Sequence, residues 1–485
     1  MSSTLRLFWE AAGGNVPEHW EFKTIDELLE HPKAISVGVM YPGSDTDGGV
    51  PLIKVSDVKN GAIASRPSFC ISNKVDEEYK RTRLNGSELL LTLVGNPGDC
   101  VIVTDEMCGW NVARALAVIR LKDTQLRSWI RYVLASKPAQ HLIEARLNTT
   151  VQKTLNLKDV REIGIPIPPR EERDSITKVI DSIEKKTLLN TQINQTLESI
   201  AQAIFKSWFV DFDPVRAKIA AKLEGADPEL AAMCAISGKS EAELEQIAKE
   251  DFAELQATAA LFPDELVESE LGEVPRGWEI LDIDKTTSLI IDHRGKTPKK
   301  LGSDWSDTGI TVLSAKHIKD GYIVNREQLR FVDTELYNKW MKEELEEGDI
   351  LLTSEGPMGE MYYLASDEKY CLSQRLYALR ANTDLISSAF LYFWLLSPYA
   401  KSDMNGRATG TTVVGIRQSE LRKVKVLTPS KSICDLFHQK VTANLKQIAL
   451  NNNESVNLAQ IRNTLLPKLL SGELDVSSLE EIIHV

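Results

Sequence analysis

The side chains best suited to chemistry in this sequence are cations gathered in short loops. One loop, DHRGKTPKK at residues 292–300, contains Arg294, Lys296, Lys299 and Lys300. Cations in such a glycine- and proline-containing loop can neutralise DNA phosphates and release their counterions, and an arginine can pair bidentately with guanine. A solvated surface loop explains the same stretch equally well, and both interpretations stay open at this point.

Three other groups of residues could contact DNA in a similar way. Arginine beside small polar residues in a glycine-containing loop suits close approach to a nucleic-acid backbone or base edge. The candidates are Lys80, Arg81 and Arg83; Arg146, Thr149, Thr150 and Lys153; and Arg407, Thr411, Thr412 and Arg417.

The sequence lacks the motifs of common catalytic and cofactor sites. A GKS triplet at 238–240 resembles the end of a phosphate-binding loop, but Met233 stands where that loop requires glycine. NPGD at 96–99 lacks the second proline and the aromatic residue of the Asn-Pro-Pro-aromatic motif of DNA amino-methyltransferases, which favours a simple turn. No HExxH is present, and the seven histidines show no metal-ligand spacing. We therefore expect no catalytic residue and no metal site.

The elements that must position the cationic loops occur twice along the chain. SELLLTLVGNPGDCVIV at 87–103 returns as GDILLTSEGPMGEMYYL at 348–364. VPEHWEF at 16–22 returns as VPRGWEI at 274–280. Because the offset between the copies stays between 258 and 262 residues, we interpret the chain as a duplicated domain.

Each copy is expected to have an α+β fold. Short β-branched runs, such as 50–55 and 310–313, alternate with glycine turns. One helix is expected in each copy, around 128–134 and 389–395.

A long helix is expected after each copy, because apolar and small polar residues recur there every three or four positions. The first series is Ile176, Ile180, Ile183, Thr187, Asn190, Ile193, Leu197, Ile200 and Ile204, and it ends near Asp213-Pro214. The second is Phe437, Val441, Leu445 and Ile448, then, after asparagines at 451–453, Leu458, Ile461 and Leu465 before Pro467. A buried asparagine at such a seam fixes the register, and Asn190 and Asn451 hold matching places.

The two long helices are predicted to pack against each other as an antiparallel coiled-coil pair that separates the two copies. The alternative is that each helix covers only the domain before it. The expected organisation is a first domain at 1–169, a long helix at 170–210, an acidic helical spacer at 211–270, a second domain at 271–430, a second long helix at 431–470 and a tail at 471–485.

Composition and charge leave the partner open. Of the 485 residues 42% are hydrophobic and 26% are charged, as in ordinary globular proteins. The formal charge of −13 comes mainly from 211–270, where 5 Lys and Arg stand against 15 Asp and Glu. No secretory signal, membrane span or CxxC pair is evident, so we expect a cytoplasmic protein with reduced cysteines.

Taken together, these features resemble the specificity (S) subunit of type I restriction-modification systems. The resemblance rests on the VPxxWE openings, the GDILLT-like hairpins, the IPIPP closing segment with its echo, and the two long helices. Three further segments are similar to that family: SIAQAIFKSWFVDFDPVRAK at 199–218, LFPDELVESELGEVPRGWE at 261–279 and LLPKLLSGEL at 465–474. The match covers essentially the whole chain, and the first copy departs in having SELLLT in place of GDILLT.

The resemblance implies a non-catalytic DNA-binding subunit. Two target-recognition domains would each read one half of a bipartite, asymmetric site on double-stranded DNA. The helices would set the spacing and dock two modification (methyltransferase) subunits, and restriction (translocase and nuclease) subunits would complete an antiviral defence complex. S-adenosylmethionine, ATP and magnesium would be held by those partners, and this chain would bind no cofactor of its own.

Two other interpretations remain. A single-chain methyltransferase or nuclease would need a cofactor motif, and DNA methylation by the purified chain with S-adenosylmethionine alone would identify it. A protein-binding scaffold would have two partner-binding domains that grip proteins, and competition by duplex DNA separates it from a DNA reader. Because the two copies are near neutral, we also expect the chain alone to bind DNA weakly.

Overall fold

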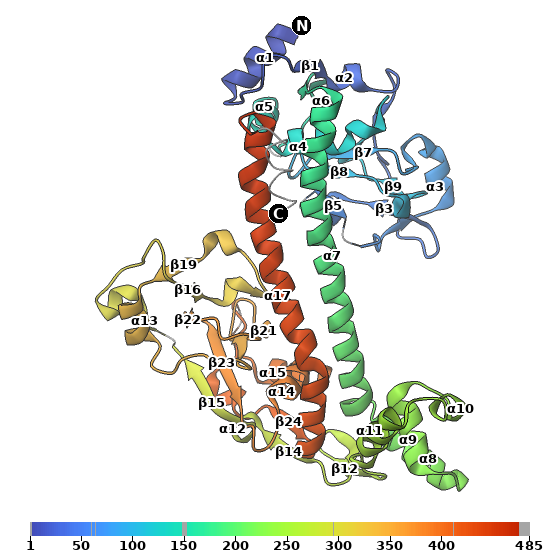
Figure 1. Cartoon of the computed structure of the whole chain (residues 1–485), viewed down its shortest axis with the longest axis vertical. Coiled ribbons are helices and arrows are strands. Elements are labelled where there is room, and N and C mark those ends of the chain that lie inside the picture. The colour runs from blue at the N-terminus through green and yellow to red at the C-terminus, as the bar shows by residue number, and fades with distance from the viewer. Residues whose placement is uncertain are drawn as a thin grey trace. The chain divides into compact units, whose positions relative to one another are not determined.

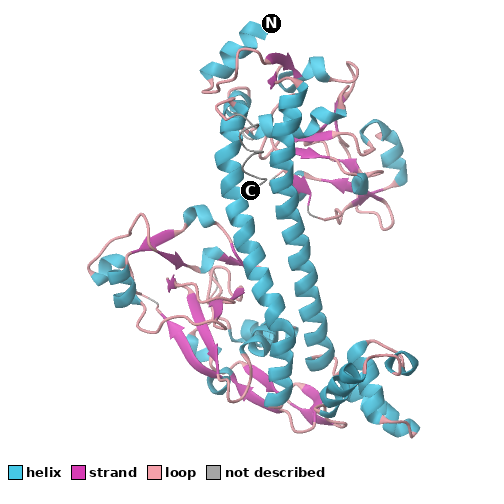
Figure 2. Cartoon of the chain, viewed as in Figure 1, coloured by secondary structure: helices cyan, strands magenta, loops and turns pink. Residues whose placement is uncertain are grey.

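A computed structural model describes residues 2–59, 61–63, 65–147, 153–293, 295–410 and 412–474. The chain forms two compact units. The first unit contains Met1–Leu188 with Glu454–Val485, and the second contains Leu189–Asn453. Helices and strands are mixed within each unit (Figure 2), which confirms the α+β fold expected from the sequence.

The first unit contains six helices and eleven strands among its described residues, apart from the long helices. The helices are α1 (Ser2–Ala11), α2 (Ile25–Leu28), α3 (Asn73–Glu78), α4 (Arg127–Ala135), α5 (Lys137–Glu144) and α6 (Leu157–Arg161). The strands are β1 (Glu21–Thr24), β2 (Ile35–Val37), β3 (Val50–Ile53), β4 (Val58–Lys59), β5 (Ala62–Ile63), β6 (Cys70–Ile71), β7 (Leu89–Thr92), β8 (Cys100–Ile102), β9 (Asn111–Val112), β10 (Leu116–Ile119) and β11 (Gly164–Ile167).

The second unit follows the same plan and adds a helical insertion. Its helices are α8 (Asp213–Glu224), α9 (Pro228–Ser237), α10 (Glu241–Leu244), α11 (Lys249–Ala260), α12 (Ile283–Thr286), α13 (Thr334–Trp340), α14 (Ser388–Leu396), α15 (Pro398–Arg407) and α16 (Gln418–Leu421). Its strands are β12 (Leu266–Ser269), β13 (Gly272–Pro275), β14 (Glu279–Asp282), β15 (Thr287–Asp292), β16 (Ile310–Leu313), β17 (Ile318–Lys319), β18 (Tyr322–Ile323), β19 (Arg330–Val332), β20 (Ile350–Thr353), β21 (Met361–Tyr363), β22 (Tyr370–Leu372), β23 (Leu376–Ala381) and β24 (Lys425–Thr428).

Each unit is built around an antiparallel sheet of four strands. The strand order is β2-β10-β7-β8 in the first unit and β15-β23-β20-β21 in the second. The repeated segments of the sequence form the central hairpins, β7 with β8 and β20 with β21. All four residues of β7 and of β20 are buried, because both faces of these central strands are covered. This explains why the segments are continuously apolar and do not alternate.

A smaller sheet of three strands accompanies each four-stranded sheet. Its order is β6-β3-β9 in the first unit and β19-β16-β22 in the second. In both, one neighbouring pair is parallel: β3 with β9, and β16 with β22. Because corresponding strands are joined in the same order, the predicted tandem pseudo-repeat is confirmed.

Two long helices contribute to the cores of both units. They are α7 (Arg170–Phe209) and α17 (Lys431–Leu470), each of 40 residues. In the first unit Ile176 of α7 and Leu469 of α17 are buried in the core. In the second, Phe209 of α7 packs against Phe437 of α17 with ring centroids 5.3 Å apart.

The predicted antiparallel pairing of the helices is confirmed within each unit (Figure 1). In the first unit Lys186 of α7 pairs with Glu454 of α17 at 3.2 Å. In the second, the Asn194 side chain exchanges hydrogen bonds of 2.8 Å with Asn451 and Asn452. Because each helix also packs against the domain that precedes it, the alternative interpretation is correct in part.

The predicted seam of α7 is wrong at Ile193 and Ile200, whereas Leu197 is half-buried and Ile204 packs against the core. Ile193 and Ile200 are 36% and 45% exposed, whereas Asn194 and Ala201 are buried. In α17, Ile461 is likewise 47% exposed. Two adjacent stripes of α7 both contain suitable residues at spacings of three and four, so periodicity alone cannot select the inward one.

The acidic spacer forms a small helical cluster at the end of α7. Pro214 occupies the first turn of α8, so the expected end of the long helix near Asp213-Pro214 is confirmed. Lys218 is buried, and its ammonium group donates to Glu229 at 2.7 Å and to the Phe262 carbonyl at 2.9 Å. Within the described residues, no helix has the length and apolar character required to span a membrane.

Candidate nucleic-acid interface

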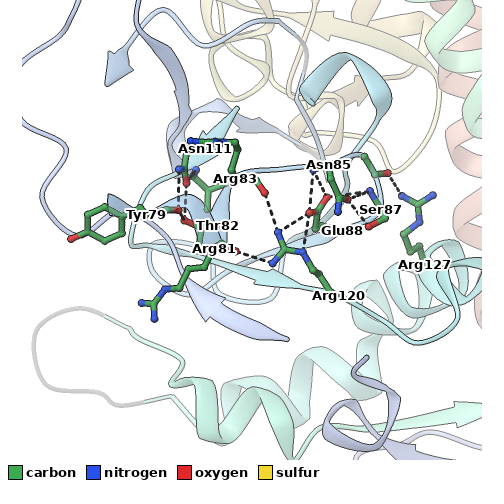
Figure 3. Close-up of polar contacts among 12 residues, drawn as sticks. Tyr79, Arg81, Thr82, Arg83, Asn85, Ser87, Glu88, Asn111, Arg120 and Arg127 are labelled. Carbon is green, nitrogen blue, oxygen red and sulfur yellow. Dashed lines mark hydrogen bonds and ion pairs between the residues drawn. The ribbon is translucent and has the colours of Figure 1, made fainter. Parts of the chain in front are cut away.

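A buried carboxylate and an arginine organise one end of the four-stranded sheet in the first unit (Figure 3). Glu88, just before β7, is fully buried and accepts hydrogen bonds from the backbone amides of Asn85 and Ser87. Arg120, just after β10, donates to Glu88 at 2.9 Å and 3.1 Å. We call this end of the strands, marked by Glu88 and Arg120, the carboxylate end.

The second unit repeats this arrangement. Asp349 is 1% exposed, and Arg380 donates to both of its carboxylate oxygens, at 2.9 Å and 2.8 Å. Hydrogen bonding to Asp349 raises the pKa of Arg380 above its ordinary value. The departure of SELLLT from GDILLT therefore substitutes one buried carboxylate for another and keeps its partner.

A threonine closes each central hairpin at the other end of the sheet. The Thr92 hydroxyl accepts a 3.0 Å hydrogen bond from the Asp99 amide, and the Thr353 hydroxyl accepts one of 2.8 Å from the Glu360 amide. These turns follow β7 and β20. We call this end of the strands, marked by Thr92 or Thr353, the turn end.

The first cationic group lies at the carboxylate end. Arg120 donates to the backbone carbonyls of Arg81 and Arg83, at 2.8 Å and 3.0 Å, and so fixes this segment (Figure 3). Arg83 is ion-paired with Asp76 and with Glu77, and these bonds raise the pKa of its guanidinium. Lys80 pairs with Glu77 at 3.2 Å. Arg81 is exposed, and its guanidinium has no carboxylate partner within the described residues.

The second cationic group belongs to the turn end. Thr154 bridges Val94, the second residue after β7, so Lys153 is brought to this end and is exposed. Arg146, just after α5, is half-buried and donates to the Leu142 carbonyl in the last turn of that helix. Thr149 and Thr150 lie outside the described residues. The structure therefore places the two predicted groups of the first domain at opposite ends of one sheet.

The basic loop of the second unit is partly anchored. Lys296 is half-buried and donates to the Trp340 carbonyl at 2.7 Å. Lys299 and Lys300 are exposed on the short helical turn Pro298–Leu301. Arg294 lies outside the described residues. Within this loop the His293 ring is buried, and burial lowers its pKa below the ordinary value.

The remaining predicted group also lies at a turn end. Gly415 bridges Glu355, the second residue after β20, and this brings the loop before α16 to the hairpin turn. Thr412 and Arg417 are exposed there. Arg407 is half-buried and donates to Asp403 at 2.7 Å. Thr411 lies outside the described residues.

The residues that hold these segments in place were not predicted from the sequence. Glu88 and Asp349 are 261 residues apart, and Arg120 and Arg380 are 260 apart, so the repeat alignment contained a signal for them. A carboxylate and an arginine that recur at matched positions are more easily taken for surface charges. The described residues contain no group of three or more metal-ligating side chains arranged to hold an ion.

Comparison with known proteins gives concordant matches. The family model for the type I restriction modification DNA specificity domain matches twice, at residues 17–199 and 275–460. The HindI specificity subunit of Haemophilus influenzae is 34% identical over 69% of this chain and 73% of its own length. The EcoBI specificity subunit of Escherichia coli is 29% identical over 47% of this chain and 46% of its own.

A solved structure shares the fold. The type I restriction-modification S subunit from M. genitalium matches with a TM-score of 0.54 and 14% identity, over 93% of this chain and 96% of that one. Two matched domains and a duplicated framework thus lead to one assignment: the chain belongs to the type I restriction-modification DNA specificity family.

Proposed function

We propose that each recognition domain of this specificity subunit reads one half of a bipartite, asymmetric site on double-stranded DNA, and that α7 and α17 set the spacing between the halves. The observation that carries this proposal is the duplication itself. Two domains keep the same buried framework, Glu88 with Arg120 and Asp349 with Arg380, yet carry different side chains on their surfaces. One scaffold with two sets of surface residues suits two different base sequences.

The long helices are proposed to dock two modification subunits. Leu189, Ile193 and Ile200 of α7 are all at least 36% exposed, and their spacing places them along one stripe of the helix. An apolar stripe that faces water on a helix already paired elsewhere is typical of a protein interface.

Chemistry is assigned to the partners and not to this chain. The functional side chains found here bind, orient and hold segments in place, which is the role of a non-catalytic subunit. We assign S-adenosylmethionine to the modification subunits, and ATP and magnesium to restriction subunits. The complex would act on double-stranded DNA in the cytoplasm.

The test is a single-molecule map of methylated adenines in DNA from cells that co-express this chain with its modification subunit. We expect a motif split into two specific halves, present only when this chain is present. If the complex assembles but no split motif is methylated, the proposal that the chain reads DNA is refuted. Whether duplex DNA competes with protein partners for binding to this chain would then test the scaffold interpretation.

The purified chain provides a second test. We expect no methyl transfer by this chain alone with S-adenosylmethionine, and only weak DNA binding at physiological salt because the domains are near neutral. Nanomolar, site-specific binding by the isolated chain would contradict the idea that the complex supplies much of the phosphate contact.

A further inference from the structure

Three segments that are distant in sequence end side by side at the turn end of the first domain. Strands β3 and β9 are parallel, with Ile53 opposite Val112, and Val39 forms a parallel bridge with Ala113. Parallel segments have their carboxyl-terminal ends on the same side. The residues that follow these three segments are therefore gathered there: Met40 and Tyr41, Lys54, and Arg114.

Backbone hydrogen bonds fix this juxtaposition. The Arg114 amide donates to the Val39 carbonyl at 2.9 Å, and the Ala113 amide donates to the Ile53 carbonyl at 2.8 Å. The hairpin turn after β7 adjoins the same place, since a side chain on Gly95 would meet Val55 at 3.5 Å. The strand-end cluster (Tyr41, Lys54 and Arg114) thus lies on hydrogen-bonded backbone next to the hairpin that both domains repeat.

The side chains of this cluster are accessible and make few contacts with the rest of the domain. Tyr41 is 76% exposed, and Arg114 is exposed with only a 3.8 Å contact from its guanidinium to the Met40 sulfur. Lys54 is held with its ammonium group 3.5 Å above the Phe69 ring. Within the described residues neither Arg114 nor Lys54 has a carboxylate partner. An exposed arginine that contacts the residue before an exposed tyrosine has the chemistry of a base-reading surface.

The second domain differs at the equivalent positions. The repeat places Ser314 opposite Lys54 and Gln374 opposite Arg114, each 260 residues later. They follow β16 and β22, which are parallel in the same way. The framework is kept while the strand-end residues change, as expected where the two domains read different bases.

The carboxylate end is the less suitable surface for DNA. In the second domain the segment that Arg380 holds carries four exposed carboxylates, Glu343, Glu344, Glu346 and Glu347. Three of them are paired with Lys369, Arg380 and Lys446. The segment itself still carries an excess of negative charge, which disfavours contact with DNA phosphates. If both domains present the same surface of one scaffold, the turn end is the surface that remains.

We propose that the strand-end cluster is the base-reading surface of the first domain, with Arg114 donating to a guanine edge in the major groove, Tyr41 providing apolar contact and Lys54 neutralising a phosphate. This rests on the proposed function, because it names the residues that carry the readout of one half-site. It also removes Arg81, at the carboxylate end, from base reading.

The experiment compares matched arginines in the full complex with the modification subunit. Arg114→Ala and Arg81→Ala both remove an exposed arginine without a carboxylate partner, one from each end of the same sheet. Methylated adenines are mapped for each variant, and methylation rates are measured on duplexes that carry each single base change in the first half-site. Co-purification with the modification subunit controls for folding.

We expect Arg114→Ala to lower discrimination at one base pair of one half-site by roughly 5- to 150-fold, the effect of losing one bidentate contact. The other half-site should be unchanged, and Arg81→Ala should keep the wild-type motif. Lys54→Ser with Arg114→Gln, the residues of the second domain, should alter the same half only.

Two results would overturn this inference. A wild-type motif and rate for Arg114→Ala, in a complex that assembles normally, would remove Arg114 from base reading. Loss of discrimination in Arg81→Ala instead would move the reading surface to the carboxylate end. A wild-type chain that directs no split motif would refute the proposed function itself, which is a distinguishable outcome.

Discussion

The two recognition domains differ at their surfaces far more than in their interiors. Arg120 and Arg380 each bind a buried carboxylate and the backbone of the segment that precedes it, through two carbonyls for Arg120 and one for Arg380. That segment is basic in the first domain, with Lys80 and Arg81, and acidic in the second. The buried carboxylate–arginine pairs therefore stabilise the fold of each domain, and the exposed residues around them can differ.

The largest expected effect tests whether the framework is equivalent in both domains. Glu88→Ala leaves the half-buried Arg120 without its carboxylate partner, which typically costs about 3–5 kcal/mol. Asp349→Ala leaves Arg380 paired only with the exposed Glu346, so its cost should be somewhat smaller. Hydrogen exchange should show loss of protection in the first unit for Glu88→Ala and in the second for Asp349→Ala. Substitution of the exposed Glu344 by Ala is the control. Equal loss in both units from either variant would disprove separate, equivalent frameworks.

A smaller effect is expected at the hairpin turns. Thr92→Val and Thr353→Val remove the hydroxyl that accepts the Asp99 or Glu360 amide, at a cost of about 1–3 kcal/mol for an unsatisfied buried group. Urea unfolding of the full chain should shift by a similar amount for the two variants. A large difference between them would show that the two turns are not equivalent.

In the pair of long helices, one double substitution is expected to stabilise the protein, in contrast to the substitutions above. Asn194 and Asn451 are buried and bonded to each other in the second unit. Buried asparagines fix register at a cost in stability, so the double variant Asn194→Leu/Asn451→Leu should raise the melting temperature. Methylation should spread to sites with altered spacing between the half-sites. Unchanged spacing with a higher melting temperature would show that register is set elsewhere along the pair.

The smallest expected effect is a pH dependence of stability that differs between the two units. Burial lowers the pKa of His293 and His317 below 6.5, whereas the described histidines of the first unit are exposed. Because the unfolded chain binds more protons, the free energy of unfolding of the second unit should fall as pH drops below about 6.5. Hydrogen exchange corrected for intrinsic rates should show this between pH 7 and pH 5.5 in the second unit only. The variant His293→Gln/His317→Gln should weaken the dependence, and an unchanged slope would contradict it.

The sequence predicted what depends on local pattern and on the repeat. The duplication, the α+β class and the antiparallel helices follow from offsets and periodicity. The exposure of Ile193 and Ile200 on α7 was not predicted, because Ile193 and Asn194 begin two stripes of similar spacing and only packing selects between them. The sequence around an isoleucine such as Ile193 does not show whether its side chain lies in the core or at an exposed interface.

The candidate site was predicted less completely for a topological reason. Runs of cations, such as 80–83 and 292–300, are visible in sequence, but the structure engages several of them in ion pairs or carbonyl contacts. Lys54 and Arg114 lie 60 residues apart in the chain, and only the parallel pairing of β3 with β9 brings them together. Isolated cations of this kind cannot be recognised before the strand order is known.

The central claim is that each domain reads one half-site through its own surface on a shared framework. A chain in which residues 16–169 are replaced by a second copy of residues 274–430 tests it most directly. Co-expressed with the modification subunit, it should methylate a split motif whose two halves are the same, matching one half of the wild-type motif. An assembled complex that still recognises two different halves would contradict the account.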